Sequence, residues 1–181
     1  NTFYEDIYLN LSSSDNEFNV HKPTLPLHKN YTLTVDVSDY SESERKQLYI
    51  ASISKKGTSS YMETVKKDKI FYTSTKKLGT FKLLRDSIAP NINLFKFNDE
   101  QWLSNHNTLK VKIADTDSGI RRYRGEIDGE WILMEYNVKD GTLTYDFNDK
   151  IFENAKHQLK VTVSDKVGNS KTIHATFFRK K

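Results

Sequence analysis

The sequence contains no cysteine, only 3 prolines and 7 glycines, and no long apolar run. Without cysteine the chain can form no disulfide, no thiolate metal site and no cysteine nucleophile. No stretch approaches the roughly 20 apolar residues of a membrane-spanning helix. The glycines are scattered singly, which excludes a glycine-rich phosphate loop. What remains is a chain of 181 residues with 12% aromatic residues, enough for a folded protein, and a formal net charge of +4 that is typical of an ordinary solvated surface.

The start of the chain also lacks a recognisable signal. The first residue is Asn1 and not an initiator methionine, and no charged segment followed by an apolar one comes after it. A secretory leader would have that pattern. We therefore expect the sequence to be a fragment or a processed form of a longer protein.

Short runs of alternating apolar and polar residues dominate the sequence. Clear examples lie at 31–37, 109–113 and 159–163, and clusters of Asp, Asn, Gly and Ser separate such runs. This alternation predicts antiparallel strands that bury one face and expose the other. No segment keeps a 3.6-residue apolar period, and 41–47 is expected to form one helical turn at most. The predicted fold class is all-β.

Two Asp-Gly pairs lie between candidate strands, at Asp128-Gly129 and Asp140-Gly141. This dipeptide favours the positive φ angles of a two-residue hairpin turn. Each pair therefore predicts that the chain reverses direction there. The three strands that the two turns connect are expected at 120–127, 131–136 and 142–147.

A domain boundary is expected near Pro90. Pro90 cannot donate a ladder hydrogen bond and favours an extended conformation at Ala89, and a new apolar run begins at Ile92. We predict two domains, 1–86 and 87–181, each with seven short strands, which is typical of an immunoglobulin-like sandwich. The architecture is then two tandem immunoglobulin-like antiparallel β-sandwich domains. The candidate strands are 3–11, 17–21, 31–38, 47–54, 60–65, 69–73 and 79–84 in the first domain, and 91–95, 108–114, 120–127, 131–136, 142–147, 157–164 and 171–178 in the second.

Patterns that carry catalytic chemistry are missing from the sequence. The histidines form no His-x-His or His-Glu-x-x-His pair, and no serine lies in a Gly-x-Ser-x-Gly elbow. We therefore assign no catalytic, cofactor-binding or metal-ligating residue, and we expect no enzymatic activity from this chain. The five histidines of the chain are His21, His28, His106, His157 and His174.

Two polar turns follow alternating strands, at 115–120 and 165–169. Asp and Asn side chains there can accept hydrogen bonds from the backbone two residues on, and glycine allows a positive φ, so a turn-forming role explains them. The alternative uses the immunoglobulin topology, which brings these loops to the domain junction. Oxygen ligands gathered there would suit calcium. The candidate ligands of this interdomain calcium site are Asp86, Asp115, Asp117, Asp165 and Asn169.

A basic run occurs at 121–124. Alternation places Tyr123 in the core and Arg122 and Arg124 on the outer face, where Lys160 and His174 can share the same sheet. This strip is either a solvated outer face or a contact surface for an anionic wall polymer. Nucleic acid is not an expected partner, because no ordered aromatic and basic motif accompanies the run. The two tryptophans, Trp102 and Trp131, are expected in the core.

The second half of the chain resembles a known family. Its motifs are Asp86-Ser87-Ile88-Ala89-Pro90, Asp115-x-Asp-Ser-Gly-Ile120, Asp165-Lys-Val-Gly-Asn169, Gln101-Trp102-Leu103-Ser104, Trp131-Ile-Leu-Met-Glu-Tyr136 and Ala155-Lys-His-Gln-Leu159. Together these motifs resemble the C-terminal region of secreted lysostaphin-type zinc metallopeptidases, in which β-sandwich modules follow a peptidoglycan-cleaving domain. The resemblance covers about 78–181, and 1–77 only loosely.

The resemblance implies an accessory role. The family's zinc motif, His-x-x-x-Asp with a later His-x-His, is absent, so none of its catalytic residues can be transferred to this chain. The implied partners are an upstream catalytic domain of the same polypeptide and a cell-wall glycan or anionic envelope polymer. The implied location is secreted, periplasmic or at the cell envelope. The alternative is an adhesin-like or carbohydrate-binding module that has no link to catalysis.

Overall fold

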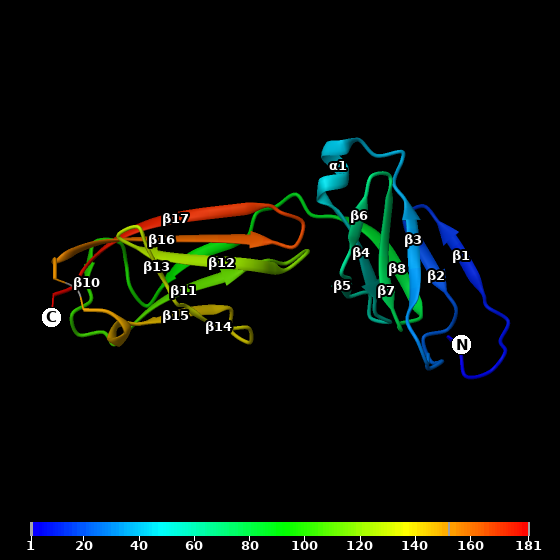
Figure 1. Cartoon of the computed structure of the whole chain (residues 1–181), viewed down its shortest axis with the longest axis horizontal. Helices are drawn as coiled ribbons and strands as arrows, with labels where there is room; N and C mark the ends of the chain where they lie inside the picture. Colours follow the sequence, from blue (N-terminus) through cyan, green and yellow to red (C-terminus); the bar gives the residue numbers. More distant parts are fainter. Residues whose placement is uncertain (1, 152, 181) are drawn as a thin grey trace. The chain divides into compact units, whose positions relative to one another are not determined.

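The computed structural model describes residues 2–151 and 153–180 and is built almost wholly from β-strands, which confirms the predicted fold class. The chain divides into two compact units, Asn1–Ser87 and Ile88–Lys181, and each is described by itself (Figure 1). The sequence predicted this division one residue earlier. No helix in the described ranges is long and apolar enough to span a membrane.

The first unit contains a five-stranded sheet of order β1-β2-β8-β4-β5 and a three-stranded sheet of order β3-β7-β6. All strand pairs in both sheets are antiparallel. Apolar residues of the two sheets, among them Val35, Ile50, Phe71 and Phe81, share one buried cluster. The strands are β1 (Leu11–Ser14), β2 (Glu17–Val20), β3 (Tyr31–Asp36), β4 (Leu48–Ile53), β5 (Ser59–Tyr61), β6 (Val65–Lys67), β7 (Ile70–Thr75) and β8 (Gly79–Arg85).

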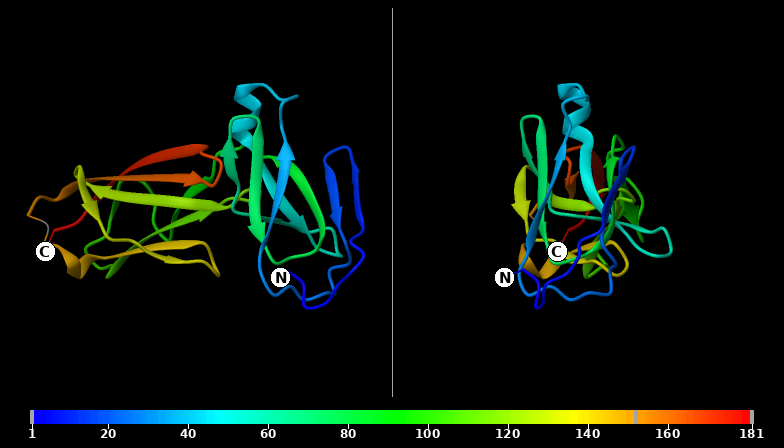
Figure 2. Two further views of the ribbon diagram at one scale, coloured as in Figure 1. Left: turned by 45° about the vertical axis from the view of Figure 1, so that its right-hand side comes forward. Right: turned by 90° about the vertical axis from the view of Figure 1, so that its right-hand side faces the viewer.

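One short helix, α1 (Glu42–Gln47), connects β3 to β4 and lies at one end of the first unit (Figure 2). Ser41 caps it, because its hydroxyl accepts a hydrogen bond from the backbone of Glu44 and its own backbone amide donates to the Glu44 carboxylate. Hydrogen bonds from Ser41 hold the pKa of Glu44 below its usual range. The single helical turn expected at 41–47 is therefore a capped helix of six residues.

The prediction of a strand over 3–11 is wrong for most of its length. Residues 3–10 form no strand, and pairing with β2 begins only at Leu11. Tyr8 is 98% exposed and Leu11 66% exposed, so these apolar side chains have no sheet face on which to pack. The strand expected at 60–65 is divided as well, into the end of β5 and the start of β6.

The second unit contains two sheets that share one apolar core. Their orders are β10-β17-β16-β12-β13 and β14-β15-β11-β9. The core joins Leu159 and Val161 of the first sheet to Val111 and Leu143 of the second. The strands are β9 (Asn91–Phe95), β10 (Gln101–Trp102), β11 (Thr108–Ala114), β12 (Ile120–Ile127), β13 (Glu130–Ile132), β14 (Glu135–Asn137), β15 (Thr142–Asp146), β16 (Lys156–Asp165) and β17 (Ser170–Phe178), and a 3-10 turn, η1 (Phe147–Asp149), follows β15.

The order of strands in the second unit is that of an immunoglobulin-like sandwich. Across their sheet β9, β11, β15 and β14 occupy the positions of strands A, B, E and D. In the other sheet β12, β16 and β17 occupy those of C, F and G, with β13 as an added edge strand. Figures 1 and 2 display β16 and β17 along one side of this unit and β11 and β15 along the other. The short β10 adds to the open edge of β17 in parallel.

The single strand predicted at 131–136 is two strands in two different sheets. β13 pairs with β12, whereas β14 pairs with β15. Between them Leu133 is 58% exposed, while its neighbours Ile132 and Met134 are buried. The chain therefore leaves one sheet and enters the other at Leu133. The hairpin turn predicted at Asp128-Gly129 is confirmed, with φ angles of 55° and 83°.

Candidate functional site

The outer face of the five-stranded sheet in the second unit gathers the basic residues that the sequence singled out. The register pairs Arg124 with Thr162, and Lys160 with both Glu126 and His174, so their side chains lie on the same side of the sheet. Arg122 and Arg124 are exposed, and this confirms the predicted strip. We call this surface the polar face. Its members are Trp102, Arg122, Arg124, Glu126, Trp131, Lys156, Gln158, Lys160, Thr162, Ser164, Ser170, Thr172, His174, Thr176 and Phe178.

A carboxylate at the centre of the polar face organises two of its cations. The Glu126 carboxylate lies 2.6 Å from Nε of Arg124 and 3.1 Å from Nζ of Lys160. These hydrogen bonds, first from Arg124 and then from Lys160, hold the pKa of Glu126 below its usual range. The face carries four lysine or arginine side chains against this one carboxylate, so it attracts anions.

Both tryptophans lie on the polar face, and the expectation that they belong to the core is wrong. Trp102 and Trp131 are each 58% exposed. Trp131 lies opposite Glu126 in the register, and Trp102 stacks on Phe178 with 5.3 Å between ring centroids. In each case the next residue, Leu103 or Ile132, takes the buried position, because neighbouring strand residues point to opposite faces.

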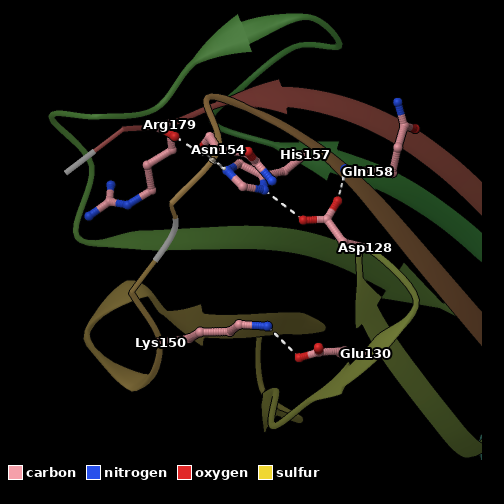
Figure 3. A network of polar contacts seen from close by, with 7 residues as sticks. All are labelled: Asp128, Glu130, Lys150, Asn154, His157, Gln158 and Arg179. Atoms are coloured by element: carbon pink, nitrogen blue, oxygen red, sulfur yellow. Dashed lines mark hydrogen bonds and ion pairs between the residues drawn. The ribbon is translucent and has the colours of Figure 1, made fainter.

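A polar network at one end of the second unit contains a carboxylate and histidine pair (Figure 3). Nδ1 of His157 lies 2.7 Å from the carboxylate of Asp128, which also accepts a hydrogen bond of 2.8 Å from the backbone amide of Gln158. Nε2 of His157 lies 2.8 Å from the carbonyl oxygen of Asn154 and 3.3 Å from that of Arg179. All of these partners of the ring are acceptors, so a ring nitrogen that carries hydrogen has a partner to which it can donate.

This pair is structural and not catalytic. In a catalytic triad the carboxylate orients the ring so that Nε2 can reach a nucleophile. Here Nε2 of His157 is directed at backbone carbonyls, and the residue is only 2% exposed. Figure 3 also contains the ion pair between Lys150 and Glu130, both of which lie near the surface. A surface pair of this kind contributes little to stability.

Arg179 completes the network at the end of β17 and is 6% exposed. Its Nη1 donates to the carbonyl oxygens of Leu103 at 2.7 Å, Ser104 at 3.4 Å and His106 at 2.8 Å. The guanidinium carbon lies 4.1 Å from the centroid of the Phe147 ring. This side chain therefore holds the segment 103–106 against the end of the sandwich. Sequence reasoning missed both His157 and Arg179, although each continues the inward alternation of its strand.

The residues proposed as calcium ligands form polar turns. In the second unit a carboxylate oxygen of Asp115 lies within 4.8 Å of one of Asp165. Asp115 accepts hydrogen bonds from the backbone amides of Asp117 at 3.2 Å and Gly119 at 2.6 Å. Asp117 itself is exposed. The structure thus provides direct evidence for the turn-forming role of Asp115.

Asp165 is fully buried and forms a denser set of bonds. Its Oδ1 accepts from the backbone amides of Val167, Gly168 and Asn169, and its Oδ2 accepts from the Asn169 side chain at 2.7 Å. Asp86 belongs to the first unit, where it is buried and its amide donates to Gln47. The interdomain calcium site that would join these residues stays a prediction.

The histidines do not gather into a metal centre in the described ranges. No histidine there belongs to a group of three potential metal ligands. His28 packs edge-on against Tyr4, with 5.2 Å between ring centroids. His21 accepts a weak hydrogen bond of 3.4 Å from the backbone of Asn10, and His174 is exposed on the polar face.

Comparison with known proteins gives a family match for the first unit only. Residues 1–86 match the family model described as a Zu5-like domain. No curated protein matches the chain. The matched segment falls in the unit that lies outside the clearest part of the resemblance to peptidases.

Three solved structures are weakly similar to this chain. The fibronectin(III)-like modules of CbhA from Clostridium thermocellum give a TM-score of 0.40 at 12% identity, over 84% of this chain and 86% of theirs. The endo-β-1,4-mannanase from Thermotoga petrophila gives 0.42 at 7% identity, over 52% of this chain and 20% of its own. The spore cortex lytic enzyme SleM from Clostridium perfringens gives 0.36 at 9% identity, over 66% and 38%. The chain thus spans a fifth of the mannanase, and with every TM-score under 0.5 none of these similarities assigns a function.

Proposed function

We propose that this chain is a non-catalytic accessory β-sandwich region of a cell-envelope zinc metallopeptidase that acts on peptidoglycan. In this proposal the protein is secreted, periplasmic or attached to the cell envelope. Its partners are a catalytic domain upstream in the same polypeptide and an anionic polymer or glycan of the envelope. The support comes from the resemblance of residues 78–181 to the C-terminal region of lysostaphin-type peptidases and from the polar face of the second unit.

The observation that carries the proposal is that one sheet face gathers the exposed Arg122, Arg124 and His174 and the half-buried Lys160. A flat array of cations can contact several anionic groups of one polymer at once. Such contacts between exposed charges weaken as salt is added, because the screening length falls to about 8 Å at physiological ionic strength. Binding to the envelope should therefore be salt-sensitive.

Co-sedimentation with purified peptidoglycan sacculi tests this contact. The double variant Arg122→Ala with Arg124→Ala should sediment less than the wild type at low salt. A matched control is Lys55→Ala with Lys56→Ala, which removes the same charge from an exposed turn of the first unit. Equal loss in both pairs would attribute the binding to net charge alone, and unchanged binding of the arginine pair would remove this role of the face.

The non-catalytic part of the proposal has its own test. The isolated chain should not solubilise peptidoglycan, even when zinc is added. Peptide mapping of the native polypeptide should find a preceding domain with His-x-x-x-Asp and His-x-His. Metal-dependent cleavage by the isolated chain would overturn the assignment.

The exposed tryptophans favour a second candidate, an adhesin-like or carbohydrate-binding module with no link to catalysis. Trp102 and Trp131 present flat aromatic surfaces to solvent, which a purely positioning module does not need. The same peptide mapping separates the two candidates. Additional sandwich repeats upstream, and no peptidase domain, would favour the second.

A further inference from the structure

Two exposed tryptophans mark opposite edges of the polar face. Trp102 lies on the edge strand β10 and Trp131 on the edge strand β13 of the same five-stranded sheet. Tryptophan is among the more buried residue types, so two that are each 58% exposed on one face are unusual. The two rings do not belong to one continuous apolar patch, because β12, β16 and β17 present polar side chains between them.

The polar side chains between the tryptophans are already fixed by cross-strand hydrogen bonds. Nε2 of Gln158 donates to the Thr176 hydroxyl at 2.9 Å, and the hydroxyls of Thr162 and Thr172 lie 2.9 Å apart. Arg124 and Lys160 are held by Glu126. The surface is therefore preorganised, and a ligand would meet donors and acceptors without ordering them first.

The spacing of the tryptophans indicates an extended ligand. From β10 to β13 the sheet has four inter-strand steps, and the two tryptophans are offset by about four residues along the strands, so they lie roughly 23 Å apart across the face. A single sugar or a compact ligand could touch only one of them. A chain of several sugar units can reach both.

The chemistry of the face selects a glycan that carries acidic groups. An indole ring offers a flat apolar surface on which the C–H face of a pyranose ring can pack. Hydroxyl, amide and guanidinium groups match the hydroxyls and carboxylates of a sugar chain. We propose that the polar face binds an extended acidic polysaccharide, with Trp102 and Trp131 as its two stacking positions. This inference rests on the proposed function, since it names the ligand class and the aromatic contacts of the same face.

The fluorescence of the two tryptophans can report ligand binding to the polar face. They are the only tryptophans of the chain, so intrinsic fluorescence observes this face directly. Titration with polygalacturonate should change the intensity and the emission maximum in a saturable way. Poly-L-glutamate, which has the carboxylates without the sugar rings, should bind more weakly. Hydroxyethylcellulose, which has the rings without the charge, should bind more weakly as well.

The variant Trp131→Ala should weaken binding of polygalacturonate about tenfold, measured by affinity electrophoresis, whereas Trp131→Phe should retain most of it. Tyr8→Ala is the matched control, because Tyr8 is an exposed aromatic residue of the first unit. A far-UV circular dichroism spectrum like that of the wild type shows that the variant folds. Trp102→Ala is the weaker test, because Trp102 also stacks on Phe178.

Three outcomes would overturn the inference. One is equal affinity of Trp131→Ala and the wild type. Another is binding of poly-L-glutamate as tight as that of polygalacturonate, which would reduce the contact to charge. The third is concentration-dependent dimerisation that Trp131→Ala abolishes, which would make the face an interface between copies of the chain.

The inference and the proposed function fail in different ways. If the chain sediments with sacculi through Arg122 and Arg124 and Trp131→Ala does not change polysaccharide binding, the proposed function holds and the inference is contradicted. If the chain does not sediment with sacculi but binds polygalacturonate through Trp131, the inference holds and the envelope role is contradicted.

Discussion

The carboxylate of Asp128, in the turn between β12 and β13, binds the neighbouring strand β16 through both of its oxygens. Oδ2 lies 2.7 Å from Nδ1 of His157, and Oδ1 accepts from the backbone amide of Gln158 at 2.8 Å. Asp128 is also the first residue of the Asp-Gly turn between β12 and β13, with a φ of 55°. One residue therefore shapes a hairpin turn and attaches that turn to the adjacent strand.

Replacing Asp128 should destabilise the second unit. Asp128→Ala removes both hydrogen bonds and puts alanine at a positive φ, and we expect a loss of about 2–3 kcal/mol in the free energy of unfolding. Tryptophan fluorescence in urea measures this unit alone, since both tryptophans lie in it. The control Asp140→Ala, in the other Asp-Gly pair, removes a single bond to the Thr142 amide and should cost about 1 kcal/mol. Equal costs would contradict the role given to His157.

A second prediction concerns the buried guanidinium of Arg179. Arg179→Lys keeps the charge but loses the guanidinium over the Phe147 ring and cannot reach all three backbone carbonyls, so about 2–4 kcal/mol of stability should be lost. Arg124→Lys, at an exposed position of the same unit, should change the stability by no more than about 0.5 kcal/mol. Urea unfolding followed by tryptophan fluorescence compares the two. A tolerated Arg179→Lys would show that the segment 103–106 is held by other contacts.

The alkaline behaviour of the first unit should depend on Tyr31. Burial raises the pKa of Tyr31 from 10.0 to about 12, and its hydroxyl donates to the carbonyl oxygen of Lys77 at 2.7 Å. Because the folded pKa exceeds the unfolded one, this contribution to stability is complete below pH 10 and is lost as the pH rises from 10 towards 12. Burial also raises the pKa of Tyr136 and Tyr145, so absorbance at 295 nm should record a late phenolate step to which several tyrosines contribute. Tyr31→Phe should lower the amplitude of that late step. A late step of unchanged amplitude in Tyr31→Phe would refute this.

The turn at Asp165 gives a fourth prediction. Asp165→Ala removes four hydrogen bonds from buried oxygens and should cost about 3 kcal/mol or prevent the second unit from folding. The milder Asp165→Asn keeps one acceptor oxygen and should cost less. The predicted calcium site adds a separate expectation, a melting temperature that is higher in excess calcium than in chelator. Melting curves that coincide in calcium and chelator would contradict the calcium site, and Asp165 would then have only its turn-forming role.

Alternation along the strands predicted much of the second unit. The strands expected at 91–95, 108–114 and 120–127 coincide with β9, β11 and β12. The same alternation also indicates which polar residues of the strands face inward. His157 shares its parity with Leu159 and Val161, and Arg179 shares its parity with Phe177, so both belong on the buried side. Polar residues at inward positions were the sequence signature of the network in Figure 3.

The exposure of the tryptophans could not be predicted from residue type. Trp131 and Ile132 are both apolar neighbours, and only the register with β12 decides which of them faces the core. Similarly, an apolar run such as 131–136 reads as one strand, although the exposed Leu133 marks the crossing between sheets. Both outcomes depend on which strands pair and in which register, and the alternation within one run does not contain that information.

The ladder between β16 and β17 has a mechanical consequence. It runs through nine register pairs, from Lys156 opposite Phe178 to Ser164 opposite Ser170. Inter-strand hydrogen bonds lie perpendicular to the strands, so tension that pulls β17 along its own axis away from the 165–169 turn loads all of these bonds at once, in shear. The unit then resists stretching as a whole and does not unzip bond by bond, so its strongest direction under tension lies along β16 and β17.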